Sequence, residues 1–177
     1  MAVWITADPP VGNDPPCRHR RTSRNDHAMS ATNATGMIQR GARLFDHLVI
    51  AVLNNRGKNP LFSVSERVEM LEEATRAMSN VSVATFDGLM VDFAHLQGAS
   101  AVLRGIRAIS DYEYEFQMAL MNRRLAPDLE TVFLQPAGRY SFVSSRMLKE
   151  VFSLGGDVTG LVPPNVLKRL RSRMAKP

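Results

Sequence analysis

Cysteine and long apolar runs are nearly absent from this chain of 177 residues. Its single cysteine, Cys17, excludes a disulfide framework within the chain and favours a reducing compartment. No apolar run approaches the roughly 20 residues that a membrane-spanning helix needs. The opening stretch "MAVWITADPP" reaches Pro9 and Pro10 too soon for a secretory signal. These absences predict a cytoplasmic protein.

Aromatic residues are also few, at 7% of the chain, and the net charge is +5. A basic balance suits nucleic acid or phosphorylated small molecules as partners. A nucleic-acid-binding module is an open alternative, because residues 18–24 carry several arginines and the chain ends in "LKRLRSRMAKP". Aromatic side chains are not interleaved with this basic tail, as stacking platforms for bases require. We therefore favour a solvated helix face there and no nucleic-acid partner.

Residues 1–36 differ in composition from the rest. They contain four prolines and many turn-forming residues but little apolar periodicity, which is typical of a disordered leader. Their arginines would suit a transit peptide, but Asp8, Asp14 and Asp26 argue against one, because transit peptides avoid acidic residues. We expect the folded domain to span residues 37–177.

Within residues 37–177, β-rich apolar runs alternate with segments of helical periodicity. This alternation predicts an α/β fold, with a Rossmann-like parallel sheet covered by helices on both faces. Ligands of such sheets bind beyond the carboxyl ends of the strands, here the loops 54–62, 86–90, 104–111 and 136–144. The expected strands are 47–53, 81–86, 100–105 and 130–136, and the expected helices are 37–45, a helix capped by Ser63, 88–98, 111–125, 144–156 and 163–174.

The loop at 104–111 carries an arginine pair suited to an anion. Arg104 and Arg107 each offer a planar fork for phosphate oxygens, and Gly105 allows close approach to the backbone. On an ordinary turn they would be two surface arginines, but the position favours binding. Glu113 and Glu115 in the next helix are solvated, contact a nucleotide or hold the arginines in place.

Serines form a second candidate site just before the helix at 144–156. Ser141, Ser144 and Ser145 would cap that helix, bind a phosphate at its N-terminus, or do both. Lys58 lies in the loop after the first clear strand and, taken alone, is a solvated lysine.

From about Ile38 to Leu170 the sequence resembles bacterial phosphopantetheine adenylyltransferase. The resemblance lies in "FDHLVIAVLNNRGKNPLFSVSERVEML", in "LRGIRAISDYEYEFQMALMNRRLAPDLETVFLQP" and in "YSFVSSRMLKEV". It implies the nucleotidyltransferase type of Rossmann-like fold and transfer of AMP from ATP to 4′-phosphopantetheine. The products would be dephospho-coenzyme A and pyrophosphate, in coenzyme A biosynthesis. Mg²⁺ would accompany ATP, and the chain would form a homo-oligomer, usually a hexamer.

The resemblance also implies two groups of binding residues. Phosphopantetheine would contact Lys58, Met90 and Arg104. ATP would contact Gly105, Ile106, Arg107, Glu115, Tyr140, Ser141, Phe142, Val143, Ser144, Ser145 and Arg146.

The N-terminal motif of that family is missing. The family has a first strand, a Gly-Ser/Thr-Phe-Asp-Pro loop and then Thr-x-Gly-His, whose histidine stabilises the transition state. Here Thr32 and Asn33 are followed by Ala-Thr, and Thr6 and Asp8 are a faint echo of the earlier loop. His19 and His27 have no glycine before them, so the catalytic residue is unknown.

Three explanations are open: an error in the gene sequence or its start, an impaired enzyme, or a paralogue that binds nucleotide without catalysis. The abrupt change in composition favours the first. Losing one transition-state donor costs roughly 10²–10³ in rate. A missing or altered first strand would expose apolar surface of the sheet. We therefore expect poor activity or low stability.

Overall fold

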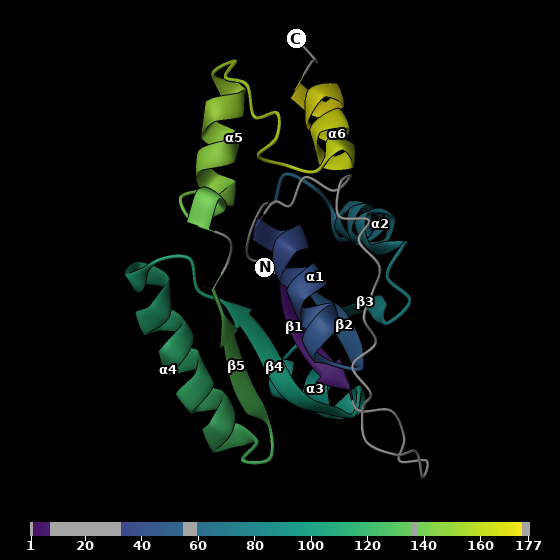
Figure 1. Ribbon diagram of the computed structural model, residues 1–177, viewed down its shortest axis with the longest axis vertical. Coiled ribbons are helices and arrows are strands. Elements are labelled where there is room, and N and C mark those ends of the chain that lie inside the picture. The colour runs from purple at the N-terminus through teal and green to yellow at the C-terminus, as the bar shows by residue number, and fades with distance from the viewer. Residues whose placement is uncertain (1, 8–32, 55–59, 136–137, 175–177) are drawn as a thin grey trace.

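The computed structural model describes residues 2–7, 33–54, 60–135 and 138–174. Strands and helices alternate along the chain, which confirms the α/β class (Figure 1). In chain order, the elements are β1 (Ala2–Ala7), α1 (Asn33–Leu44), β2 (His47–Leu53), α2 (Val64–Thr75), β3 (Val81–Phe86), α3 (Met90–Leu96), β4 (Ala99–Gly105), α4 (Ile109–Leu125), β5 (Glu130–Leu134), the 3-10 turn η1 (Gly138–Tyr140), α5 (Ser145–Ser153) and α6 (Pro164–Met174).

One five-stranded sheet forms the centre, in the order β3-β2-β1-β4-β5. β2 pairs with β3 and β4 pairs with β5 in parallel, as the sequence predicts. β1 lies between β2 and β4 but runs antiparallel to both. In Figure 1 the arrows of β4 and β5 point toward the end of the molecule that holds α5 and α6, whereas β1 points away.

The N-terminal stretch differs from the expected leader in β1 and in the start of α1. The sequence predicts a disordered leader over residues 1–36, but residues 2–7 form the central strand and α1 already begins at Asn33. Thr6 pairs with Leu48 near the start of β2 and with Ala101 in the first half of β4. It therefore lies toward the amino edge of β2 and β4, away from the loops in which ligands were expected. Asp8 lies outside the described residues.

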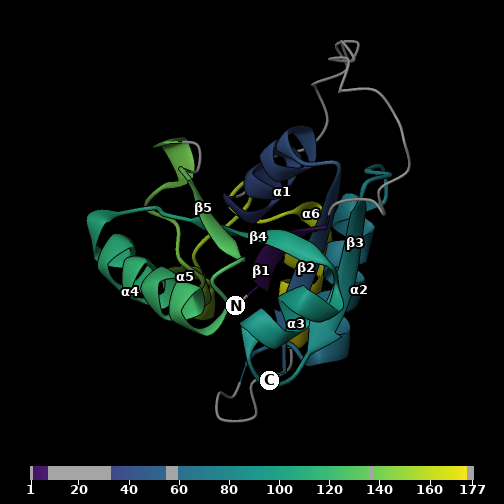
Figure 2. The same ribbon diagram turned by 90° about the horizontal axis from the view of Figure 1, so that it is seen from below.

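Two hydrophobic clusters cover the two faces of the sheet. Alternate residues of a strand point to opposite faces, so Val49 and Ala51 of β2 join one cluster while Leu48 and Ile50 join the other. α3 packs on the first face and α1 on the second (Figure 2). Burial of the side chains in these two clusters, whose buried members are at most 9% exposed, supplies the main driving force for folding.

A third, smaller cluster joins α5 and α6 to the segment that leads into α2. Its buried members are Val158, Val162 and Leu170. At the start of α2, Ser63 and Glu66 form the capping box that the sequence predicts, with Ser63 Oγ accepting from Glu66 N and Glu66 Oε2 accepting from Ser63 N.

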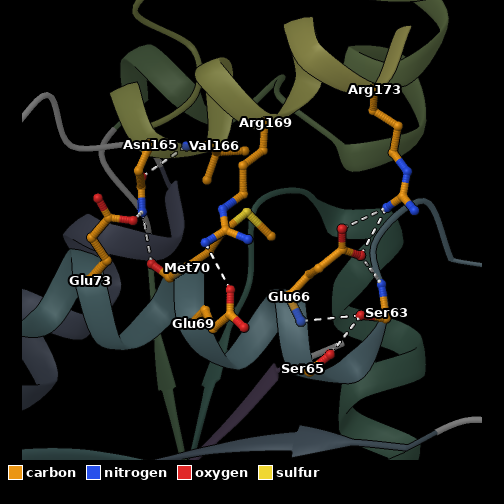
Figure 3. Close-up of polar contacts among 10 residues, drawn as sticks. All are labelled: Ser63, Ser65, Glu66, Glu69, Met70, Glu73, Asn165, Val166, Arg169 and Arg173. Atoms are coloured by element: carbon orange, nitrogen blue, oxygen red, sulfur yellow. Dashed lines mark hydrogen bonds and ion pairs between the residues drawn. The ribbon is translucent and has the colours of Figure 1, made fainter. Parts of the chain in front are cut away.

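α6 lies along α2, and three residues of α6, spaced four apart in sequence, make polar contacts with α2 (Figure 3). Asn165 donates to the Met70 carbonyl at 3.0 Å, and Arg169 Nη2 lies 3.0 Å from Glu69 Oε2. Arg173 Nη1 lies 2.8 Å from Glu66 Oε2. The positive charge of α6 is therefore offset in part by carboxylates of α2.

Candidate active site

Arg104 is the central charged group at the carboxyl edge of the sheet. It is the penultimate residue of β4 and is only 8% exposed. Its Nε donates to Glu115 Oε2 at 2.7 Å and its Nη2 to Glu115 Oε1 at 2.6 Å. Glu115 projects from the second turn of α4, so the two predicted site residues meet as a bidentate ion pair. Of the roles open for Glu115, the structure realises the holding of an arginine.

Arg107 forms a second bidentate ion pair three residues later, with Asp111. We call the Arg104–Glu115 and Arg107–Asp111 pairs the arginine clasps. Its Nε donates to Asp111 Oδ2 at 2.8 Å and its Nη2 to Asp111 Oδ1 at 3.1 Å. Its Nη1 donates to the Val143 carbonyl at 3.0 Å, so the β4–α4 turn is tied to the segment before α5. The hydrogen bond from Arg107 is the main reason that the pKa of Asp111 lies below its usual value.

Sequence reasoning missed Asp111. Its signal was present, because Arg107 and Asp111 are four residues apart across the start of a helix, close enough in sequence for their side chains to meet. By contrast, Glu113, which was weighed as a candidate, is exposed.

The serine segment begins α5 as expected for a cap. Ser144 is the N-cap residue, and its Oγ accepts from Met147 N at 3.2 Å. Ser141 Oγ donates to the Gly138 carbonyl at 2.8 Å. The capping interpretation is thus confirmed for Ser144, while phosphate binding by this segment stays a prediction. Tyr140 ends η1, Val143 is buried, Phe142 is 61% exposed, and Ser145 and Arg146 begin α5 on its exposed side.

Gly105 and Ile106 join the two arginines. The Ile106 amide donates to the Leu134 carbonyl, which keeps the chain on the sheet. At Gly105, a Cβ would lie 3.3 Å from Met37 Cε, so the first turns of α1 also approach this edge. Gly105 thus has a packing reason as well as the predicted ligand reason for lacking a side chain.

Of the remaining predicted residues, only Met90 lies within the part of the chain that the structure describes. Met90 begins α3 and packs, partly buried, against the cluster on that face of the sheet. Lys58 lies outside the described residues, as do His19 and His27. The two described histidines lie at the edge of the sheet opposite to Arg104. His47 begins β2, and its Nε2 is hydrogen-bonded to Ser82 Oγ. His95 lies in the last turn of α3, with its Nε2 3.4 Å from Asp128 Oδ2.

Within residues 2–7, 33–54, 60–135 and 138–174, no helix is both long and apolar enough to cross a membrane. No group of three or more histidine, cysteine, aspartate or glutamate side chains there is arranged to hold a metal ion.

Comparison with known proteins gives a consistent result. Residues 35–151 match the family model described as cytidylyltransferase-like. The chain is 49% identical over 141 residues to the phosphopantetheine adenylyltransferase of Oleidesulfovibrio alaskensis, covering 80% of this chain and 83% of that protein. It is 52% identical to the enzyme of that name from Anaeromyxobacter dehalogenans (strain 2CP-C), and the match covers 80% of this chain and 86% of that protein. It is 50% identical to the enzyme of the same name from Azoarcus sp. (strain BH72), and the match covers 78% of this chain and 85% of that protein. The chain, with its α/β sheet and its arginine clasps at the carboxyl edge, therefore belongs to the phosphopantetheine adenylyltransferase family of cytidylyltransferase-like proteins.

Proposed function

We propose that this protein transfers AMP from ATP to 4′-phosphopantetheine, giving dephospho-coenzyme A and pyrophosphate. The supporting observation is the pair of arginine clasps at the carboxyl ends of the parallel strands. Arg104 and Arg107 are held by Glu115 and Asp111, close to the serine segment before α5. Two oriented guanidinium groups at one edge suit a reaction between two phosphorylated substrates.

In this reaction an oxygen of the pantetheine phosphate attacks the α-phosphorus of ATP. The bond between the α-phosphorus and the bridging oxygen breaks, and pyrophosphate leaves. Lys58, Met90 and Arg104 bind phosphopantetheine in this proposal. The stretch Gly105–Arg107, Glu115 and the segment 140–146 bind ATP. These residues act by placing the two reactants in line and by offsetting charge on the phosphates.

Three further features belong to the proposal. Mg²⁺ enters with ATP, coordinated by phosphate oxygens and water, as is usual for nucleotide-bound magnesium. The protein works in the cytoplasm without a nucleic-acid partner. It forms a homo-oligomer, of six chains by analogy with the family. Many large apolar side chains on α4, including Tyr114, Leu120 and Met121, are more than half exposed and would be covered by such an assembly. Light scattering after gel filtration tests the size.

A second candidate function is nucleotide binding without catalysis. One observation favours it: antiparallel β1 has its carboxyl end beside His47 and Ala99, at the edge of the sheet opposite to Arg104. The family's phosphate loop follows directly from its first strand. A loop that leaves β1 at Ala7 starts on the wrong side of the sheet to serve as that loop.

Pyrophosphate release tests the two functions against each other. The full chain is given ATP, Mg²⁺ and 4′-phosphopantetheine, beside a repaired chain in which residues 1–36 are replaced by a family-type strand and its Gly-Ser-Phe-Asp-Pro/Thr-x-Gly-His loop. We expect strong turnover from the repaired chain and a rate lower by at least about 10² from the native chain. Turnover by both chains at equal rates would show that the missing histidine is replaced from elsewhere. Failure of both chains would refute the assignment of the site.

A further inference from the structure

Asp111 occupies one edge of the Arg107 guanidinium and leaves another edge open. The carboxylate engages the Nε and Nη2 hydrogens, and the Val143 carbonyl accepts from Nη1. An arginine has five N–H donors. Two donors therefore remain, one on Nη1 and one on Nη2, that have no hydrogen-bond partner in the part of the chain that the structure describes.

The contact is more than a favourable charge at a helix terminus. Asp111 lies in the first turn of α4, where any acidic residue is stabilised by the helix dipole. A residue in that role alone would leave its side chain in water. Asp111 instead makes three contacts with Arg107: the Nε and Nη2 bonds, and a bond from the Arg107 backbone amide to Oδ2 at 3.3 Å. The side chains of Arg107 and Asp111 are 35% and 27% exposed, so the clasp is partly shielded from solvent.

We propose that Asp111 is a positioning residue for ATP: it fixes the Arg107 guanidinium so that the two remaining N–H donors face the triphosphate beside the segment 140–146. This inference rests on the proposed function, because it assigns the triphosphate to Arg107. Asp111 itself contacts no substrate. It acts by removing the rotamer freedom that a long arginine side chain otherwise loses on binding.

The direction in which Asp111→Asn changes the affinity for ATP distinguishes a positioning role from simple electrostatics. Asp111→Asn removes a negative charge near a bound triphosphate, which by electrostatics alone strengthens ATP binding. It also disrupts the bidentate pair with Arg107, because one carboxylate oxygen is replaced by an NH₂ group. That group donates hydrogen bonds, whereas the arginine needs acceptors. Positioning therefore predicts the opposite sign: ATP binding weakened by about tenfold, the scale of one charge-assisted hydrogen bond.

The experiment is calorimetric titration of the full chain with ATP and Mg²⁺, which requires no turnover. Asp111→Asn is compared with the native chain and with Glu130→Gln, which breaks the exposed Arg123–Glu130 pair elsewhere on the molecule. We expect the Kd for ATP to rise about tenfold in Asp111→Asn, and to stay unchanged in Glu130→Gln. The Kd for 4′-phosphopantetheine should change less than about twofold, because Arg104 has its own carboxylate partner.

A double substitution tests whether Asp111 acts through Arg107. In an Arg107→Ala background there is no guanidinium to position, so Asp111→Asn should leave ATP binding unchanged or improve it. If Asp111→Asn binds ATP as well as the native chain or better, the positioning role is overturned while the proposed function stands. The role is equally overturned if the substitution weakens binding to the same extent without Arg107. A native chain that binds no ATP overturns the proposed function and this inference with it.

Discussion

Glu115→Gln should be among the most destabilising single substitutions near the proposed site. Arg104 and Glu115 form a bidentate pair whose side chains are only 10% and 12% exposed. Glutamine keeps the shape of glutamate but leaves a buried guanidinium facing a neutral amide. Breaking a buried ion pair from one side costs about 3–5 kcal/mol, because the remaining charge loses its carboxylate partner while it stays buried.

The expected shift in melting temperature follows from the size of the protein. For a domain of 150–250 residues, each kcal/mol moves the midpoint by about 2–4 °C. A loss of 3 kcal/mol, at the lower end of the range for breaking a buried pair, therefore lowers the midpoint by roughly 6–12 °C. Thermal melting followed by circular dichroism, with urea titration beside it, gives both quantities.

The chain supplies its own control in Arg123 and Glu130. Their ion pair is as short, at 2.5 Å, but the side chains are 62% and 60% exposed. Exposed pairs contribute at most about 1 kcal/mol, so Glu130→Gln should change the midpoint by less than about 4 °C. The double substitution Arg104→Met with Glu115→Leu should recover most of the stability lost in Glu115→Gln, because it removes both charges. If Glu115→Gln melts within about 2 °C of the native chain, the argument from burial fails.

Three further predictions concern local features of the fold. Ser63→Ala should cost about 1 kcal/mol in urea unfolding, because it removes the N-cap of α2; an unchanged midpoint would mean that α6 alone fixes this end of the helix. Gly41→Ala should lower the melting temperature even though alanine favours helices, because its Cβ would lie 2.8 Å from Leu103 Cδ2 in the core; a stabilised variant would contradict the packing. Asp111 has a folded pKa below the reference value of 3.8, so its stabilising contribution is present above about pH 4 and is lost as the pH falls through the folded pKa. The difference in unfolding free energy between the native chain and Asp111→Asn should therefore shrink on acidification below pH 4, and a constant difference would count against the clasp.

The sequence predicts β2 and β3 at the bounds that the structure has, and β4 and β5 to within two residues. It succeeds there because each strand is a short β-rich apolar run bounded by polar or turn residues, a purely local signal. The capping box at Ser63 and Glu66 is equally local, since three residues separate its two members.

The contacts of the candidate site depend less on local signals. Arg104 and Glu115 are eleven residues apart, and their pairing requires that α4 folds back beside the end of β4. The bond from Arg107 to the Val143 carbonyl spans 36 residues. Composition and spacing identify these side chains as anion-binding candidates, but only the crossover between β4 and β5 brings them together. Asp111 was missed for a different reason: an acidic residue in a first helical turn is ordinarily explained by the helix dipole.

The direction of β1 is the feature that no local pattern encodes. Periodicity marks a segment as a strand, but the same segment forms backbone hydrogen bonds with its neighbours in either direction. The expected Rossmann-like sheet is parallel throughout, and its strands were expected only within residues 37–177. In the structure, β1 lies at the centre of the sheet but runs antiparallel to its neighbour β2. The carboxyl end of a strand fixes where the next loop starts. With β1 reversed, the sheet has its central strand, but the loop that follows β1 starts at the edge opposite to Arg104.

Cross-linking can test that direction with four positions. Antiparallel pairing makes Ala7 the partner of His47 and Ala2 the partner of Val52. Paired residues have Cα atoms about 4.5–5.5 Å apart, within the range that a disulfide spans. With Cys17 replaced by serine, Ala7→Cys with His47→Cys and Ala2→Cys with Val52→Cys should oxidise readily. The exchanged pairs, Ala2→Cys with His47→Cys and Ala7→Cys with Val52→Cys, place the cysteines about five residues apart along the strand, roughly 16 Å, and should stay reduced. Oxidation of the exchanged pairs alone would mean that β1 is parallel, in which case its loop would leave at the edge that holds Arg104 and the weak activity expected of the native chain would need another cause.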